Sequence, residues 1–210
     1  MKRKFVFSCG IVGASLFIVA SILGGLQIEG YSVVSQYISE SYATGLPNTD
    51  YLRYMYMASG LLLALFAFLA TTVLPSTKGV RVGLILFGII YGLGTMITGF
   101  FPCDMGCRPD PEDATLSQFI HNTAGFLVYS IVPFCLIGIG VDSRKWSGAI
   151  NISSYSLLCG ALSLVFVFLL FGNPTGSMIG LFQRVIEGAI LFWVIRTAFY
   201  MLQPDKIKAP

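Results

Sequence analysis

Six long apolar stretches run through this chain of 210 residues and limit the class of structure that it can form. Each is close to the roughly 20 residues that an α-helix needs to cross a bilayer. The stretches are continuously apolar and do not alternate with a period of two, so they favour helices over the strands of a membrane barrel. The predicted spans are Phe5–Leu26, Tyr54–Leu74, Val80–Phe101, Phe119–Ile139, Ala149–Phe171 and Ser177–Met201.

We therefore predict an all-α polytopic membrane protein, in which residues 1–210 form one integral membrane domain, a six-transmembrane-helix bundle. Only 11% of the residues are charged, whereas soluble domains carry about 25%. This composition argues against an ordinary soluble enzyme, a nucleic-acid-binding protein and a disordered chain. No phosphate-binding loop or dinucleotide fingerprint is present. With a single histidine in the sequence, we expect neither a cofactor nor a structural zinc site, which needs four ligands.

Lysine and arginine collect on one side of the predicted membrane. Loops on the cytoplasmic side of a membrane protein carry an excess of these residues. We therefore expect a multi-pass protein of the cell membrane with both termini in the cytoplasm. Only Arg53 and Arg108 fall in the outward loops, whereas the cytoplasmic side holds Lys2, Arg3, Lys4, Lys78, Arg81, Arg144, Lys145, Lys206 and Lys208.

The first outward loop contains apolar residues at helical spacing between Tyr31 and Tyr42. This pattern predicts a short amphipathic helix lying in the membrane interface. One interpretation is a helix that seals the outer ends of the bundle. The other is a lid whose Ser35, Ser39 and Glu40 point inward over a cavity.

The second outward loop carries Cys103 and Cys107. On the non-cytoplasmic side, two cysteines four residues apart can form a disulfide, although geometry decides whether they do. A metal site is the rival interpretation, and it lacks ligands. A redox-active pair usually has two residues between the cysteines, a spacing that is absent here.

His121 is the only histidine and lies about one turn inside the fourth predicted span. An ionisable side chain in a membrane is costly, so it is treated as a functional candidate with a partner. Asp104, at the outer end of the third span, is the expected partner. Together they would form an acid/base pair. The alternative is a histidine that is hydrogen-bonded for packing only.

The sixth span holds Gln183, Arg184 and Glu187 inside an apolar stretch. The spacing of Arg184 and Glu187 allows the two side chains to pair on one helix face. A self-neutralising pair that stabilises helix packing is one interpretation. In the other, Arg184 points into an outward-opening cavity and binds an anionic group such as a phosphate or carboxylate.

The order of several short motifs resembles the prokaryotic membrane family catalogued as domain of unknown function 998. The motifs are Ser35-Gln36-Tyr37-Ile38-Ser39-Glu40, Gly45-Leu46-Pro47, Phe101-Pro102-Cys103-Asp104, Ile120-His121 and Gln183-Arg184. The resemblance covers nearly the whole chain and implies six or seven membrane spans, but no reaction. The layout is more distantly similar to DRAM-like proteins and to proteins of GPI-anchor lipid remodelling, which points toward lipid. The positions carried over are Ser39, Glu40, Asp104, His121 and Arg184.

These observations predict an outward-facing polar pocket that binds a lipid or another amphiphile with an anionic headgroup. An alternative is a lipid hydrolase or transferase that uses His121 and Asp104 as acid and base, with Ser39 or Ser35 as nucleophile. A second alternative is a small transporter. We expect membrane lipids as partners and no nucleic acid, and a homo-oligomer remains open. The candidate ligand-binding residues are Arg184, Glu187, Gln183, His121, Glu40 and Ser35.

Overall fold

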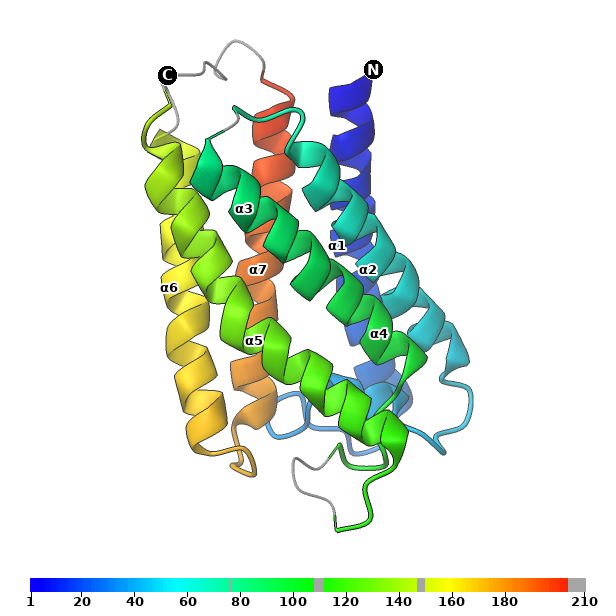
Figure 1. Cartoon of the computed structure of the whole chain (residues 1–210). Coiled ribbons are helices and arrows are strands. Elements are labelled where there is room, and N and C mark those ends of the chain that lie inside the picture. The colour runs from blue at the N-terminus through cyan, green and yellow to red at the C-terminus, as the bar shows by residue number, and fades with distance from the viewer. Residues whose placement is uncertain (76, 108–111, 147–149, 204–210) are drawn as a thin grey trace.

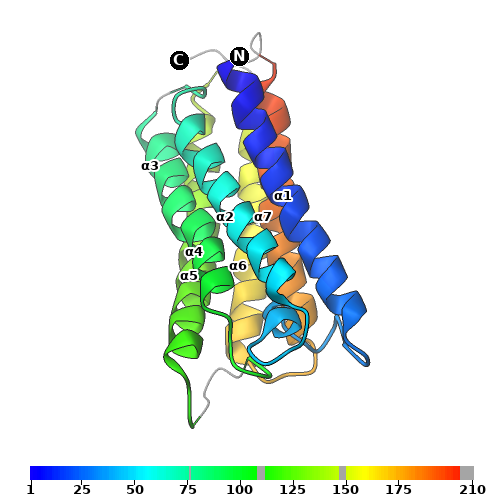
Figure 2. The same cartoon turned by 90° about the vertical axis from the view of Figure 1, so that its right-hand side faces the viewer.

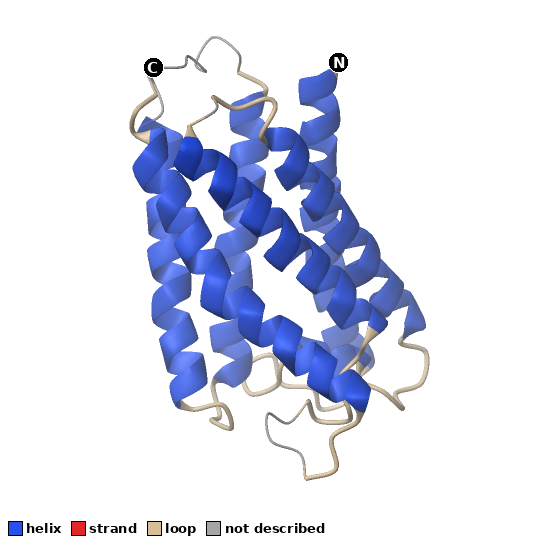
Figure 3. Cartoon of the chain, in the orientation of Figure 1, coloured by secondary structure: helices blue, strands red, loops and turns tan. Residues whose placement is uncertain are grey.

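A computed structural model describes residues 1–75, 77–107, 112–146 and 150–203. These residues form helices joined by loops and turns, with no strand among them (Figure 3). Five of the sequence features discussed above lie outside the described residues: Arg108, the start of the fifth predicted span at Ala149, Lys206, Lys208 and the end of the chain at Pro210.

Helices occupy all six predicted spans, with bounds that differ by a few residues. The third span combines α3, a π-helical segment η2 and α4 into one continuous rod (Figures 1 and 2). The helices are α1 (Lys2–Gln27), α2 (Asp50–Ala70), α3 (Lys78–Phe87), η2 (Gly88–Leu93), α4 (Gly94–Phe100), α5 (Leu116–Ser143), α6 (Ile150–Gly172) and α7 (Ile179–Met201).

Five of the spans in the described part of the chain are long and apolar enough to cross a membrane by length and composition. They are α1, α2, the α3–α4 rod, α5 and α6. The helix α7 has a similar length and packs against α1 and α6, but it carries Arg184, Glu187 and Arg196. Large apolar side chains such as Phe126 and Phe168 are exposed on the outside of the bundle. This protein is therefore a multi-pass membrane protein whose outer surface suits a lipid environment.

Small residues let the third span approach α2 closely. A Cβ added at Gly92 would lie 2.6 Å from the backbone nitrogen of Ala64, so no larger residue fits without a shift of the backbone. The π-helical segment that contains Gly92 also contains Tyr91, whose side chain is completely buried. Such segments frequently occur at functional sites. Glycine at this position thus brings Tyr91 and its segment into the centre of the bundle.

The first outward loop differs from the prediction. It contains a 3-10 helix of five residues, η1 (Ile38–Tyr42), which is shorter than the predicted amphipathic helix. Ile38 and Tyr42 are buried against the bundle. The reason is tertiary: the Val34 carbonyl accepts a hydrogen bond from Leu181 N at 2.9 Å, and Ile38 N donates to Gln183 Oε1 at 2.6 Å. Backbone groups that a longer helix would use are bonded to α7.

Candidate functional site

A polar cavity of about 70 Å³ lies beneath η1, in the half of the bundle opposite the start of α1. Residues of α1, η1, α2, α4, α5 and α7 line it. A buried water needs about 10–15 Å³, so the cavity has room for a small polar group. Its polar lining includes Ser39, Thr95, Thr98, His121, Gln183 and Glu187.

Glu187 lies at the centre of a buried hydrogen-bond network. Its two carboxylate oxygens accept from Tyr91 Oη at 2.7 Å and from Tyr129 Oη at 2.9 Å. Gln183 Nε2 donates to Tyr129 Oη at 2.8 Å, and Gln183 Oε1 accepts from Ile38 N. Gln183 and Glu187 are four residues apart, which places them on one face of α7. The network therefore connects the loop helix η1 to the middle of three spans.

Arg184 fixes the first outward loop to α7. Its Nη1 donates to Val33 O at 2.8 Å, Gln36 O at 2.9 Å and Gly180 O at 3.0 Å. Its Nη2 donates to Tyr31 Oη at 2.7 Å, and the guanidinium carbon lies 5.6 Å from the centroid of the Tyr31 ring. All of these partners are neutral.

Arg184 and Glu187 do not form the ion pair that one of the two sequence interpretations assigned to them. The two described ion pairs of the protein are Arg53–Asp50 and Lys145–Asp142. Residues three apart are about 60° apart around a helix axis, so one side chain can face the loop and the other the bundle interior. That is the arrangement here, because Arg184 bonds the loop and Glu187 bonds the two tyrosines.

A groove of about 440 Å³ runs between α1 and α7 beside this cavity. Most of its lining is apolar, with Ile22, Leu26 and Leu191 among the side chains, and Arg184 and Tyr31 also line it. We call it the α1/α7 groove. Three residues line both the groove and the cavity and form the wall between them: Phe17, Ile38 and Glu187.

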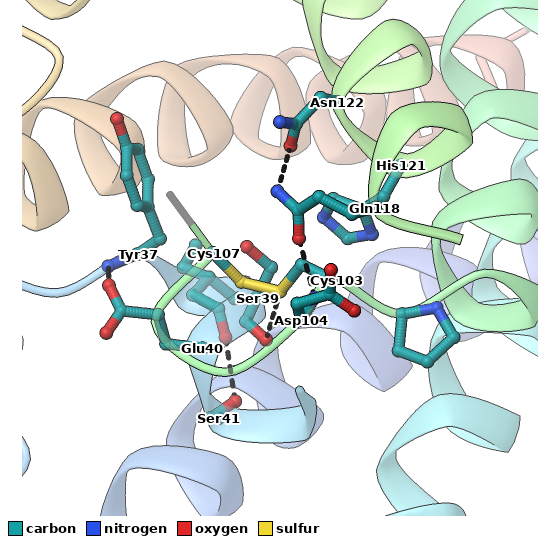
Figure 4. The surroundings of a disulfide bond; sticks show 12 residues. Tyr37, Ser39, Glu40, Ser41, Cys103, Asp104, Cys107, Gln118, His121 and Asn122 are labelled. Carbon is teal, nitrogen blue, oxygen red and sulfur yellow. Dashed lines mark hydrogen bonds between the residues drawn. A yellow bond between two sulfur atoms is a disulfide. The ribbon is translucent and has the colours of Figure 1, made fainter. Parts of the chain in front are cut away.

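His121 does not pair with Asp104, contrary to the prediction. His121 Nδ1 lies 2.9 Å from Phe101 O. Asp104 instead accepts hydrogen bonds from Thr115 N at 3.0 Å and Thr115 Oγ1 at 2.8 Å, and its own N–H donates to Gln118 Oε1 at 2.5 Å. Asp104 therefore orders the turn into α5, where Thr115 is the N-cap. Figure 4 shows Asp104 and Gln118 beside the disulfide, with His121 about one turn further along α5 from Gln118.

Cys103 and Cys107 form a disulfide in the structure (Figure 4). Cys103 Sγ lies 3.5 Å from Ser39 O, and Thr44 N donates to Cys103 O at 2.8 Å. Both cysteines are buried and pack with Ala43. The second outward loop thus contacts η1 and the residues that follow it.

Glu40 and Ser35 line neither the cavity nor the groove. Glu40 accepts hydrogen bonds from Tyr37 N at 2.8 Å and from Gln36 Nε2 at 3.0 Å, so it closes the start of η1. Tyr37 Oη donates to Pro174 O at 2.8 Å. Burial, and then the Glu40 charge, raise the pKa of Tyr37 to about 12, so this hydroxyl stays protonated at neutral pH.

The family model described as "Protein of unknown function (DUF998)" matches residues 11–200 of this chain. The chain belongs to the DUF998 family. Searches of the curated proteins and of the solved structures give no match. The resemblance inferred from the motifs is thereby confirmed, and the family brings no assigned reaction.

The sequence patterns of this DUF998 member did not identify the tyrosines of the site. Tyr56, Tyr91 and Tyr129 lie within spans, and each is at least nine-tenths buried. A buried tyrosine hydroxyl usually has a hydrogen-bond partner, so tyrosines away from the interface predict a polar interior. Of the predicted site residues, Ser39, His121, Gln183 and Glu187 meet at the cavity. Arg184 joins Glu187 at the groove, and Ser35, Glu40 and Asp104 lie in loops.

Proposed function

We propose that this membrane protein binds an amphiphile with an anionic headgroup in the α1/α7 groove. The proposal rests on the surroundings of Arg184. This cation is half-buried in an apolar groove, and its described hydrogen-bond partners are all neutral. Placing a positive charge in a low-dielectric environment without a counter-charge is costly. An anionic group bound at the guanidinium would supply that counter-charge.

The dimensions and composition of the groove support the same ligand class. Pockets that bind small molecules measure about 300–1,000 Å³ and are mostly apolar with a few polar groups. The α1/α7 groove, at about 440 Å³, fits this description. An acyl chain would pack against Ile22, Leu26 and Leu191 while the headgroup meets Arg184. A guanidinium recognises phosphates and carboxylates with two parallel hydrogen bonds. The headgroup would lie on the non-cytoplasmic side in the orientation that the lysine and arginine distribution predicts.

A hydrolase or transferase receives less support from the geometry. It required His121 and Asp104 as an acid/base pair, and the Asp104 carboxylate is bonded to Thr115. Nothing in the arrangement of the described residues favours a transporter over a binding protein.

The groove can be filled without touching Arg184. Gly188 lines the groove. A Cβ added at Gly188 would meet no side chain and no other element within 4 Å. Gly188→Leu should therefore fold while occupying the space of the acyl chain. Native mass spectrometry of the gently purified protein should show an amphiphile on the wild type and little on Gly188→Leu.

Gly138→Leu is the matched control. Gly138 is equally open, but it lines a different groove between α3 and α5. The control should keep the amphiphile. Equal amphiphile content in the wild type and in both variants, or none in the wild type, would contradict the proposal.

A further inference from the structure

The polar cavity beside the groove contains an acidic side chain, Glu187, that is 6% exposed. Among the described residues, its two oxygens accept hydrogen bonds from the neutral hydroxyls of Tyr91 and Tyr129. No lysine, arginine or histidine in the described part of the chain forms an ion pair with it. Each carboxylate oxygen can accept two hydrogen bonds, so both retain capacity for a further donor.

Aromatic rings form much of the remaining wall. Tyr56 packs against Phe17 with ring centroids 5.1 Å apart and against Tyr42 at 4.6 Å, and all three line the cavity. Tyr129 lines it on another side. Faces of aromatic rings attract cations, most strongly where water is excluded. The combination of a carboxylate with aromatic walls therefore suits an organic cation.

We propose that the cavity is a binding site for a primary ammonium group, with Glu187 as counter-ion. A primary ammonium has three N–H donors and no acceptor, which matches a carboxylate whose two oxygens retain capacity for further donors. Calcium is a poor alternative, because it takes six to eight oxygen ligands. The described residues contain no group of three metal-binding side chains.

The ammonium group has two chemical sources. It is either a free small amine or the amino headgroup of a lipid that enters from the α1/α7 groove. The second source is possible because Phe17, Ile38 and Glu187 line both spaces. The ammonium site itself does not depend on an amphiphile being bound in the groove.

The test measures binding to the purified full-length protein in detergent. Radiolabelled methylammonium represents the free amine, with sodium chloride at equal ionic strength as competitor. Short-chain phosphatidylethanolamine represents the lipid source, with short-chain phosphatidylglycerol for comparison. We expect methylammonium or phosphatidylethanolamine to bind, and sodium and phosphatidylglycerol to compete at least about tenfold less well, because a hydrogen bond to a charged group is worth that much.

Two variants locate the binding. Gly125 lines the cavity and an added Cβ there meets no side chain or neighbouring element within 4 Å, so Gly125→Leu fills the cavity and leaves Glu187 in place. Gly125→Leu should abolish ammonium binding. Gly138→Leu, which lies elsewhere, should bind as the wild type does.

The outcomes are distinct. Methylammonium binding that Gly125→Leu removes supports a free amine, and phosphatidylethanolamine binding that the same variant removes supports the lipid headgroup. The proposal is overturned if neither probe binds, if sodium competes equally well, or if Gly125→Leu leaves binding unchanged. Because Gly188→Leu tests the groove separately, failure of the ammonium site and failure of the amphiphile proposal are distinguishable.

Discussion

Two grooves on the surface of the bundle have cations among their lining residues, and they differ in what surrounds those cations. The α1/α7 groove has Arg184, and the groove between α3 and α5, of about 580 Å³, has Lys145 and the exposed Lys78. The α3/α5 groove opens near the end of the bundle where α1 begins and α7 ends, and the α1/α7 groove reaches the first outward loop at the opposite end (Figure 1).

Lys145 forms an ion pair with Asp142, which also accepts hydrogen bonds from Gly79 N at 2.7 Å and Val80 N at 3.2 Å. The positive charge of Lys145 is thus balanced within the protein, and its anion holds the start of α3, whereas Lys78 is exposed to solvent. Arg184 has no such anion. The comparison shows that a cation in an apolar groove indicates a ligand only when the fold has not already neutralised it.

Arg184→Gln should have the largest effect, on both binding and stability. The guanidinium loses its hydrogen bonds to three carbonyl oxygens and to Tyr31 Oη. Hydrogen bonds to charged groups contribute about 1.5–3 kcal/mol each, so the free energy of unfolding should fall by roughly 2–3 kcal/mol after partial compensation by the glutamine. Bound amphiphile should fall at least about tenfold. Thermal unfolding and native mass spectrometry measure the two effects.

Lys145→Gln is the matched change in the other groove. The Lys145 side chain is exposed, and an exposed ion pair contributes about 0–1 kcal/mol. Amphiphile content should therefore stay within twofold of the wild type, about the effect of a fraction of 1 kcal/mol. If Lys145→Gln removed as much amphiphile as Arg184→Gln, the two grooves would be equivalent and the comparison would fail.

Asp142→Ala should lower stability without changing amphiphile binding. The carboxylate accepts from two backbone N–H groups at the first turn of α3. Loss of such a cap costs about 0.5–2 kcal/mol, so we expect a decrease in the free energy of unfolding near 1–2 kcal/mol. Denaturant titration measures it. Retention of full stability would show that the anion of this groove has no structural role.

Gly188→Leu and Gly138→Leu should each stabilise the delipidated protein slightly. Glycine in a helix interior is less favourable than a good helix former by about 0.8–1 kcal/mol, and neither added side chain meets a neighbour. Comparison of thermal unfolding with and without co-purified lipid would sharpen the contrast. A bound ligand raises the unfolding temperature. With lipid present, this increase should be lost in Gly188→Leu and kept in Gly138→Leu. A loss in both variants would point to unspecific lipid effects.

The substitutions that should perturb the protein least are single cysteines for a labelling test at the two ends of the bundle. Asp50 and Lys78 are exposed at opposite ends of the bundle, and the free cysteines Cys9, Cys135 and Cys159 are buried. Membrane-impermeant reagent applied to whole cells should label Asp50→Cys and not Lys78→Cys. Labelling of Lys78→Cys in intact cells would reverse the orientation and place the α1/α7 groove mouth on the cytoplasmic side.

The amino-acid sequence determined the class of this protein and the number and position of its spans. An apolar stretch of about 20 residues has few alternatives to a membrane helix, because backbone polar groups must bond within the segment in lipid. The DUF998 family was likewise identifiable from the order of short motifs, and the family model confirms it. Residues such as Gln183, Arg184 and Glu187 were recognisable as unusual because their side chains are polar in an apolar span.

Only the tertiary structure decided what those polar side chains contact. Spacing along α7 allowed Arg184 and Glu187 to pair, but nearby tyrosines bind the carboxylate and loop carbonyls bind the guanidinium. Asp104 is close to His121 in the predicted topology, yet it bonds Thr115. Each outcome depends on acceptors and donors that come from segments far away in the chain. Hydrophobic spacing determines which face of a helix is buried, whereas the choice among hydrogen-bond partners is made only when several helices meet.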